Sequence, residues 1–192
     1  MLIIGFGCKA QVGKDTASIY LENKYSAYAK RVAFADKIKE EATSLFNLTK
    51  KQLHGPQEFK EAVDPRYNMS AREILQQLGK KMREIYPSIW RNFVFDVTIP
   101  ELQKQGYDLF AISDVRYPNE VDKIHEAGGI VVNILRDGAG VTVGKYHESE
   151  HALEDYEGFD FTIKNNGTFG EFYKEVDRVL EAANYGREER QH

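Results

Sequence analysis

The fold is decided by residues 2–16, which read LIIGFGCKAQVGKDT. The first five of these residues are apolar or glycine, a composition typical of a short strand that is buried on both faces of a parallel sheet. A loop with two glycines follows, and a helix is predicted from Gly13 to about Ala29. A loop between a buried strand and a helix is the setting in which backbone N–H groups and a helix N-terminus bind phosphate.

The loop resembles the phosphate-binding pattern G-x-x-x-x-G-K-[ST] without matching it fully. Cys8 stands in the position of the first glycine, Gly7 lies one residue early, and Asp15 replaces the serine or threonine. Lys14 is placed to bridge the β and γ phosphates of a nucleotide, and the side chains just beyond it serve phosphate and Mg²⁺. The predicted ATP-binding residues are Lys9, Ala10, Gln11, Val12, Gly13, Lys14, Asp15 and Thr16. The alternative is an ordinary strand-to-helix turn with a solvent-exposed lysine.

Length, charge and cysteine content limit the class of protein. A chain of 192 residues suits one compact domain with a small inserted lid. The net charge of −4 gives no support for binding a nucleic-acid polymer, and no apolar run approaches the roughly 20 residues of a membrane span. The one cysteine excludes an intrachain disulfide and fits a reducing cytoplasm, which for a phage-encoded protein is that of the host.

Strands and helices alternate along the rest of the chain. Further strands are predicted at 31–34, 109–113, 130–135 and 161–164. Further helices are predicted at 36–46, at 70–86, at 90–105 with a bend near Pro100, around 121–126 and at 168–183. Residues 47–69 are polar and contain Gly55, Pro56 and Pro65, so they are predicted to be irregular. This alternation predicts an α/β fold with a parallel sheet and helices on both faces.

A second polar cluster, Asp114 and Arg116, follows the predicted strand at 109–113. Ligands of parallel sheets bind at the carboxyl ends of the strands, so Asp114 is expected beside the phosphate loop. Its carboxylate can hold Mg²⁺ directly or through water, and Arg116 can bind a phosphoryl group. Asp15 and Asp114 are therefore the candidate metal ligands. The alternative is a turn in which Asp and Pro have ordinary capping roles.

The predicted helix at 70–86 begins with a capping box formed by Ser70 and Glu73. At about 100° per residue, a stripe within roughly 60° holds Arg72, Gln76, Gly79 and Arg83. A separate apolar face is expected to point to the core and holds Ala71, Ile74, Leu75, Leu78, Met82 and Ile85. The stripe, with Gly79 giving close access, suits an anionic nucleotide. A solvated charged face is the commoner meaning of such a pattern, and the residues alone leave both interpretations open.

Residues 136–155 are predicted to form a lid. The segment begins with RDGAG at 136–140, and its glycines and polarity are typical of a cover that excludes water during phosphoryl transfer. Arg136 is expected to offset charge in the transition state. His147 and His151 have no third ligand at convincing spacing and are expected to be lid or surface residues rather than metal ligands.

The order of these motifs resembles that of phage-type deoxynucleoside monophosphate kinases. The shared motifs are GKDT at 13–16, REILQQLG at 72–79, DVR at 114–116, RDG at 136–138, HESE at 147–150 and DFTIKNNG at 160–167. The resemblance covers nearly the whole chain and is weakest at 47–69. It implies a P-loop NTPase three-layer fold, similar to adenylate kinase, with a five-stranded parallel sheet. It also implies Mg²⁺-dependent transfer of the ATP γ-phosphate to a deoxynucleoside 5′-monophosphate.

The resemblance further implies roles for individual residues. Charge on the transferred phosphate would be offset by Lys14, Arg116 and Arg136. The acceptor would be bound within residues 36–90 and beside the second strand end, by Asp36, Lys39, Arg72, Gln76, Arg83, Trp90, Asp114 and Arg116. For Trp90, core packing is the alternative. Two other functions stay open: a P-loop kinase for dephospho-coenzyme A, phosphomevalonate or a ribonucleotide, and a nucleotide-binding regulatory module. Whether the chain also forms a homodimer with a second copy of itself stays open.

Overall fold

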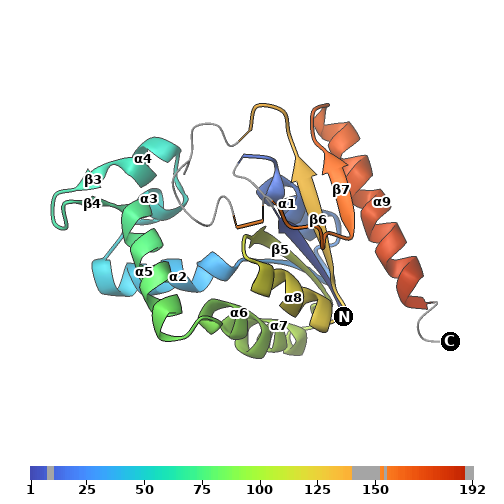
Figure 1. The fold of residues 1–192 in the computed structure, drawn as a ribbon, viewed down its shortest axis with the longest axis horizontal. Helices are drawn as coiled ribbons and strands as arrows, with labels where there is room; N and C mark the ends of the chain where they lie inside the picture. The colour runs from blue at the N-terminus through green and yellow to red at the C-terminus, as the bar shows by residue number, and fades with distance from the viewer. Residues whose placement is uncertain (8–10, 140–151, 154, 189–192) are drawn as a thin grey trace. The chain divides into compact units, whose positions relative to one another are not determined.

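The computed structural model describes residues 1–7, 11–139, 152–153 and 155–188 (Figure 1). The chain divides into two compact units. One unit comprises Met1–Ala33 together with Ile99–His192, and the other comprises Phe34–Thr98. The predicted acceptor region, residues 36–90, lies within the second unit.

The first unit contains the predicted five-stranded parallel sheet. Its strands are β1 (Leu2–Gly7), β2 (Ala29–Val32), β5 (Leu109–Val115), β6 (Ile130–Leu135) and β7 (Phe161–Lys164). They lie in the order β2-β5-β1-β6-β7, and every neighbouring pair is parallel. All six residues of the central strand β1 are buried, which explains why its sequence is apolar throughout.

Helices cover both faces of this sheet, as predicted (Figure 1). The first unit also holds α1 (Lys14–Lys24), α7 (Ile99–Lys104), α8 (Pro118–Glu126) and α9 (Phe169–Glu188). On one face, Phe6 of β1 shares a core with Leu21 of α1 and Phe172 of α9. Consecutive residues of a strand point to opposite faces, so Gly5 points to the other one. A Cβ atom on Gly5 would lie 2.6 Å from Ile124 Cδ1 of α8, so the missing side chain lets this helix pack closely.

The prediction that the first helix runs to about Ala29 is wrong. Helix α1 ends at Lys24, and the N–H groups of Tyr28 and Ala29 both donate to the Tyr25 carbonyl in the turn that follows. Ala29 is the first residue of β2, where it is buried and paired with Leu109. Strand pairing in the sheet therefore overrides the helical propensity of these residues, and β2 begins two residues before the predicted strand.

Helix α1 is fixed to α9 by a group of polar and aromatic contacts. The rings of Tyr20 and Tyr173 stack with centroids 4.1 Å apart. The Tyr20 hydroxyl donates to Asp177 Oδ2 at 2.9 Å, and Lys24 Nζ donates to Asp177 Oδ1 at 2.7 Å. The hydrogen bond to Asp177 also raises the pKa of Lys24. The helix that follows the phosphate loop is thus held at a defined position against the C-terminal helix.

The second unit is mainly helical. It contains α2 (Phe34–Phe46), α3 (Lys50–His54), α4 (Gln57–Glu61), the strands β3 (Val63–Asp64) and β4 (Met69–Ser70), α5 (Ala71–Ile85), α6 (Ile89–Phe93) and a π-helical turn at Val94–Thr98. Helix α5 begins with the predicted capping box. Ser70 Oγ accepts the Glu73 N–H at 3.2 Å, and Glu73 Oε2 accepts the Ser70 N–H at 2.7 Å.

Three predictions for residues 47–105 are wrong. Residues 47–69 are not irregular, because they form α3, α4 and the antiparallel pair β3–β4. The helix predicted at 90–105 is divided into α6, the π-helical turn and α7. The π-helical turn ends two residues before Pro100, whose missing N–H removes one helical hydrogen bond. Ile85 was expected to face the core, but it is 77% exposed at the end of α5.

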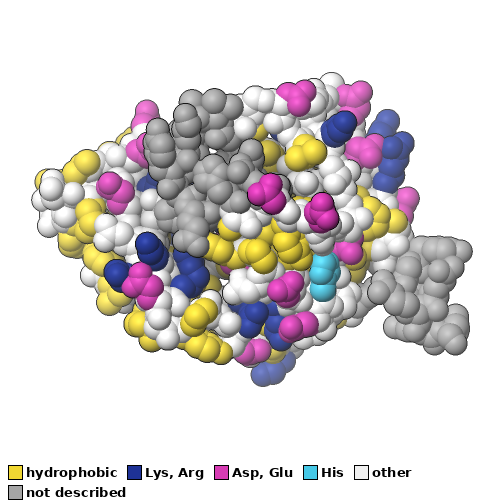
Figure 2. Space-filling model, viewed as in Figure 1, with side chains coloured by type: hydrophobic (Ala, Val, Ile, Leu, Met, Phe, Trp, Pro, Cys, Tyr) yellow, Lys and Arg dark blue, Asp and Glu magenta, His cyan; other side chains and the backbone are white. Residues whose placement is uncertain are grey.

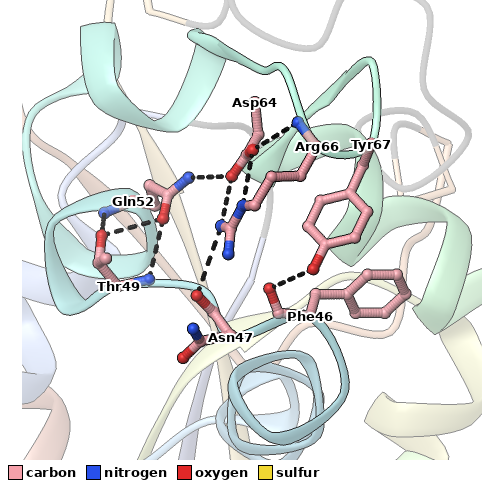
Figure 3. Close-up of polar contacts among 7 residues, drawn as sticks. All are labelled: Phe46, Asn47, Thr49, Gln52, Asp64, Arg66 and Tyr67. Carbon is pink, nitrogen blue, oxygen red and sulfur yellow. Dashed lines mark hydrogen bonds and ion pairs between the residues drawn. The ribbon is translucent and has the colours of Figure 1, made fainter.

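An ion pair between the buried Asp64 and the exposed Arg66 holds the segment 47–69 together (Figure 3). Asp64 is 7% exposed and accepts hydrogen bonds from Arg66 Nη2 at 2.6 Å and Arg66 Nε at 2.9 Å. Gln52 Nε2 of α3 donates to the same carboxylate at 3.0 Å. The Tyr67 hydroxyl adds a bond of 2.8 Å to the Phe46 carbonyl at the end of α2. The hydrogen bonds from Arg66 hold the pKa of Asp64 well below its usual range.

The surface gives two further facts about the described part of the chain. None of its helices is long and apolar enough to cross a membrane. On the face drawn in Figure 2, the coloured Lys and Arg side chains are interspersed with Asp and Glu. The Lys and Arg side chains on that face therefore have acidic side chains near them and do not form one large basic surface.

Asp64→Asn is expected to lower the free energy of unfolding near neutral pH. Because the folded-state pKa of Asp64 lies below its unfolded value of about 3.9, the ion pair stabilises the fold above that pH and loses its effect as the pH falls below it. Urea titrations at about pH 7 and about pH 3, followed by fluorescence of the single tryptophan, Trp90, measure this. The difference between variant and wild type should shrink at the lower pH.

The matched control is Asp96→Asn, an exposed residue of the same unit, which should change stability little at either pH. An equal loss of stability at both pH values in Asp64→Asn would show that the charge of Asp64 is not what stabilises the segment.

Candidate active site

The described part of the phosphate loop has an unusual backbone. Gln11 has φ 64° and Gly13 has φ 114°, so both lie in the left-handed region. A left-handed non-glycine residue is uncommon and is often found at binding sites. A Cβ atom on Gly13 would lie 2.6 Å from Asn165 Nδ2, so this position requires glycine on both conformational and steric grounds. The predicted residues Lys9 and Ala10 lie outside the described residues.

Lys14 is the first residue of α1 and is only 7% exposed. A solvent-exposed lysine in an ordinary turn, the alternative open at the sequence level, is therefore excluded. A buried ammonium group requires a polar or anionic partner, and the N-terminus of α1 beside it favours an anion. The geometry suits a lysine that contacts phosphate.

The two residues after Lys14 have different surroundings. The side chain of Asp15 is 75% exposed and lies 3.8 Å from Arg31 Nη2 of β2. Thr16 is half-buried in the first turn of α1. Arg31 is thus a cation beside the phosphate loop that sequence reasoning missed, because nothing in the local sequence of a strand shows which loop lies next to it.

The end of β5 lies beside the start of the phosphate loop, as predicted. Gly7 of β1 pairs with Val115 of β5, and the half-buried Asp114 comes directly before Val115. The neighbouring hydroxyl Ser113 Oγ is buried and has no hydrogen-bond partner among the described residues. A buried hydroxyl without a protein partner commonly bonds an ordered water.

Arg116 lies in a rigid turn between β5 and α8. Its backbone N–H donates to Glu120 Oε2 at 2.7 Å, and the N–H of Tyr117 donates to the same oxygen at 3.1 Å. Glu120 is 7% exposed, so these bonds are shielded from water. Sequence reasoning missed Glu120, although Pro118 in the first helical position and a glutamate two residues later are a usual helix start.

Arg136 begins a tight turn at the end of β6. The Ala139 N–H donates to the Arg136 carbonyl at 3.2 Å, and Gly138 has φ 70°. Asn166 holds this turn through two bonds to Asp137, from the Asp137 N–H at 2.9 Å and to Asp137 Oδ2 at 2.8 Å. Most of the predicted lid, His147 and His151 included, lies outside the described residues. After it, Phe159 packs at the end of β1, with Cε1 2.9 Å from the Cβ position of Gly7.

In the second unit, α5 carries the predicted arginine stripe. The single helix Ala71–Ile85 places Arg72, Gln76 and Arg83 on one face, and all three are half-buried. Arg72 Nε lies 3.1 Å from Glu61 Oε1, but the two groups are not aligned for a hydrogen bond, and this buried Nε has no hydrogen-bond partner among the described residues. Charge attraction to Glu61 thus holds Arg72, and the Arg72 Nε–H group donates no hydrogen bond within the described part of the chain.

Gly79 and Trp90 serve the packing of this unit. A Cβ atom on Gly79 would lie 3.2 Å from Ile38 Cδ1 of α2, so the glycine allows two helices to approach rather than giving a ligand access. Trp90 is 6% exposed, and its indole N–H donates to the Gly79 carbonyl at 3.1 Å. In α2, Lys39 Nζ lies 3.5 Å from Asp36 Oδ1. The acceptor roles of Trp90, Lys39 and Asp36 stay predictions.

The residues present fit a magnesium ion that is held mainly by phosphates. The described residues contain no group of three or more His, Cys, Asp or Glu side chains arranged to hold a metal. Mg²⁺ commonly keeps several waters and uses one or two carboxylates together with substrate phosphates. Asp114, half-buried near the end of β5, suits this arrangement. Asp15 suits it less well, because its carboxylate is mostly exposed and lies near Arg31.

Comparison with known proteins agrees with these features. The family model for deoxynucleotide monophosphate kinase matches residues 57–176. A protein of Acanthamoeba polyphaga mimivirus, whose name provisionally assigns it to these kinases, is 32% identical over 193 residues, which cover 95% of this chain and 98% of the relative. The deoxynucleotide monophosphate kinase of Escherichia phage RB69 is 24% identical over 112 residues, which cover 58% of this chain and 45% of that protein.

Solved structures support the fold. Dephospho-CoA kinase from Campylobacter jejuni superposes with a TM-score of 0.52 at 17% identity, over 96% of this chain and 98% of that one. At this identity the likeness extends to the architecture and not to the substrate. The family model spans more than half of the chain, and the mimivirus relative aligns with nearly all of it. The chain therefore belongs to the deoxynucleotide monophosphate kinase family and is a phosphotransferase with a P-loop kinase fold.

Proposed function

We propose that the protein transfers the γ-phosphate of ATP to a deoxynucleoside 5′-monophosphate and releases the diphosphate and ADP. One observation carries the proposal: the chain has two sets of groups that are suited to bind anions. The first is the phosphate loop with the buried Lys14, and the second is the arginine stripe on α5. A nucleotide-binding regulatory module needs only the first set, whereas a nucleotide kinase needs the second for its acceptor.

The proposed mechanism is a direct in-line transfer without a covalent enzyme intermediate. Backbone N–H groups of the loop and the N-terminus of α1 bind the ATP phosphates, and Lys14 offsets charge on the β and γ phosphates. Arg116 and Arg136 offset the charge that develops on the transferred group. Catalysis then comes from positioning and from charge stabilisation, because phosphoryl transfer leaves little covalent chemistry for the protein to perform.

Mg²⁺, when bound, would neutralise part of the charge on the phosphates. The residues proposed to hold it are Asp114, directly or through water, and Asp15.

The acceptor monophosphate is proposed to bind at the α5 stripe. Arg72 keeps a buried Nε that is not aligned with Glu61, so an oxygen of the acceptor phosphate can provide the better geometry. Gln76 and Arg83 supply further donors on the same face. Asp36, Lys39 and Trp90 are proposed on the acceptor side, and residues 36–90 are proposed as the acceptor region.

A coupled assay of ADP release tests the proposal. The assay contains ATP, Mg²⁺ and one member of a panel of deoxyribonucleoside and ribonucleoside monophosphates, with dephospho-coenzyme A as a control acceptor. We expect turnover with at least one deoxynucleoside monophosphate and its diphosphate as the product. Steady ATP hydrolysis that no monophosphate changes would refute the proposal and indicate a module without acceptor chemistry.

Lys14→Met is expected to lower kcat by about 10²-fold or more, because it removes a charge that stabilises the transition state. Methionine keeps much of the buried aliphatic volume, so the fold should persist. The ADP-release assay measures turnover, and circular dichroism with thermal melting checks the fold. Lys80→Ala on the exposed side of α5 is the control and should have near wild-type activity. Full activity in Lys14→Met would refute the assignment of the loop.

Arg72→Ala is expected to raise the KM for the acceptor by about tenfold while the KM for ATP changes little. Glu61→Gln removes the competing carboxylate and leaves Arg72 in place, so the acceptor KM should stay the same or fall. Steady-state kinetics with each substrate varied in turn separate these effects. An ATP-selective defect in Arg72→Ala, or an equal rise in acceptor KM in both variants, would contradict the assignment of Arg72 to the acceptor phosphate.

A further inference from the structure

Asn165, at the end of β7, touches the phosphate loop. Its side-chain amide donates from Nδ2 to the Val12 carbonyl at 2.8 Å, across 153 positions of the sequence. The same Nδ2 lies 2.6 Å from the Cβ position of Gly13. Asn165 thus contacts two consecutive residues of the loop directly before Lys14, and the function proposed above gives this contact no role.

The bond from Asn165 fixes the direction of one loop N–H group. The Val12 carbonyl and the Gly13 N–H belong to the same planar trans peptide, so they point in opposite directions. With the carbonyl turned toward Asn165, the Gly13 N–H must point away from β7. Gly13 is in the left-handed conformation, in which successive N–H groups can converge on an anion. Asn165 therefore fixes the direction of the Gly13 N–H group.

Asn165 itself is held firmly enough to act in this way. Its backbone N–H donates to the Leu135 carbonyl at 2.7 Å, which extends the pairing of β6 and β7. Helix α9 starts soon after it with a capping box in which Glu171 Oε2 accepts the Thr168 N–H at 2.8 Å. Phe172 of this helix is 2% exposed and packs 3.4 Å from the Cβ position of Gly13.

We infer that Asn165 is a positioning residue for the phosphate loop, which sets the affinity of the loop for the phosphate chain of the donor nucleotide. This inference rests on the proposed use of ATP at this loop.

The test compares two isosteric, uncharged substitutions at neighbouring positions. Asn165→Leu removes the bond to Val12, whereas Asn166→Leu removes bonds to Asp137 and leaves the loop contact in place. Calorimetry measures the dissociation constants of ATP with Mg²⁺ and of inorganic tripolyphosphate, a probe that has phosphates but no nucleoside. Asn165→Leu should weaken both ligands by about tenfold, and Asn166→Leu should weaken tripolyphosphate by no more than about twofold.

Steady-state kinetics provide a second readout. In Asn165→Leu the KM for ATP should rise while the KM for the acceptor stays near the wild-type value, a split that a general loss of structure would not give. Asn165→Ala serves in the same measurements if the leucine variant does not fold.

Several outcomes would overturn the inference: unchanged affinity in the Asn165 variants, weakening of ATP without tripolyphosphate, equal weakening in both leucine variants, or a wild-type protein that binds neither ligand. The binding measurements need no acceptor. A wild-type protein that binds both ligands but phosphorylates no monophosphate would refute the proposed function and still let the two variants decide the role of Asn165.

Discussion

The direction of the backbone N–H groups around Gly13 is the constraint on which the proposed donor site depends. A short loop binds an anion well only if its N–H groups converge before the ligand arrives, because ordering them during binding costs conformational entropy. The fold orders the loop by fixing the elements on both sides of it. The loop leaves β1, the fully buried central strand, and enters α1, which Asp177 and Tyr173 fix against α9. Asn165 then fixes the peptide between these two anchors.

The C-terminal part of the first unit therefore supports a loop that lies about 150 residues earlier in the chain. The two residues directly after β7 have different contacts: Asn165 bonds the phosphate loop, and Asn166 bonds Asp137 in the turn that follows β6. The next helix, α9, adds Phe172 beside Gly13 and Asp177 on α1. The orienting residues thus lie next to or within elements whose positions are defined by the sheet and its helices.

The sequence predicts this structure well where the deciding interactions are local, and poorly where they join residues that are far apart in the sequence. The bounds of β6 and β7 were predicted correctly, and α5 was predicted within a residue of its observed bounds, because the apolar runs and the capping box of Ser70 and Glu73 are local signals. The end of α1 and the structure of 47–69 were missed, since they depend on strand pairing by Ala29 and on the ion pair of Asp64. In the site, Lys14 followed from its motif. Arg31, Glu120 and Asn165 did not, because only the fold shows what their side chains reach.

The charges of the proposed site explain how a protein of net charge −4 can bind anionic substrates. Several of its cations lie near a carboxylate: Arg31 near Asp15, Lys39 near Asp36 and Arg72 near Glu61, at 3.8, 3.5 and 3.1 Å. Partly exposed pairs of this kind contribute only about 0–1 kcal/mol, so they keep the cations oriented and are readily exchanged. A phosphate carries more charge than a carboxylate and more acceptor oxygens, so it forms the stronger set of hydrogen bonds. Exchange of a carboxylate for a phosphate at a prearranged cation avoids the repulsion that a cluster of unpaired arginines and lysines would cause, and it requires no basic surface beyond the site itself.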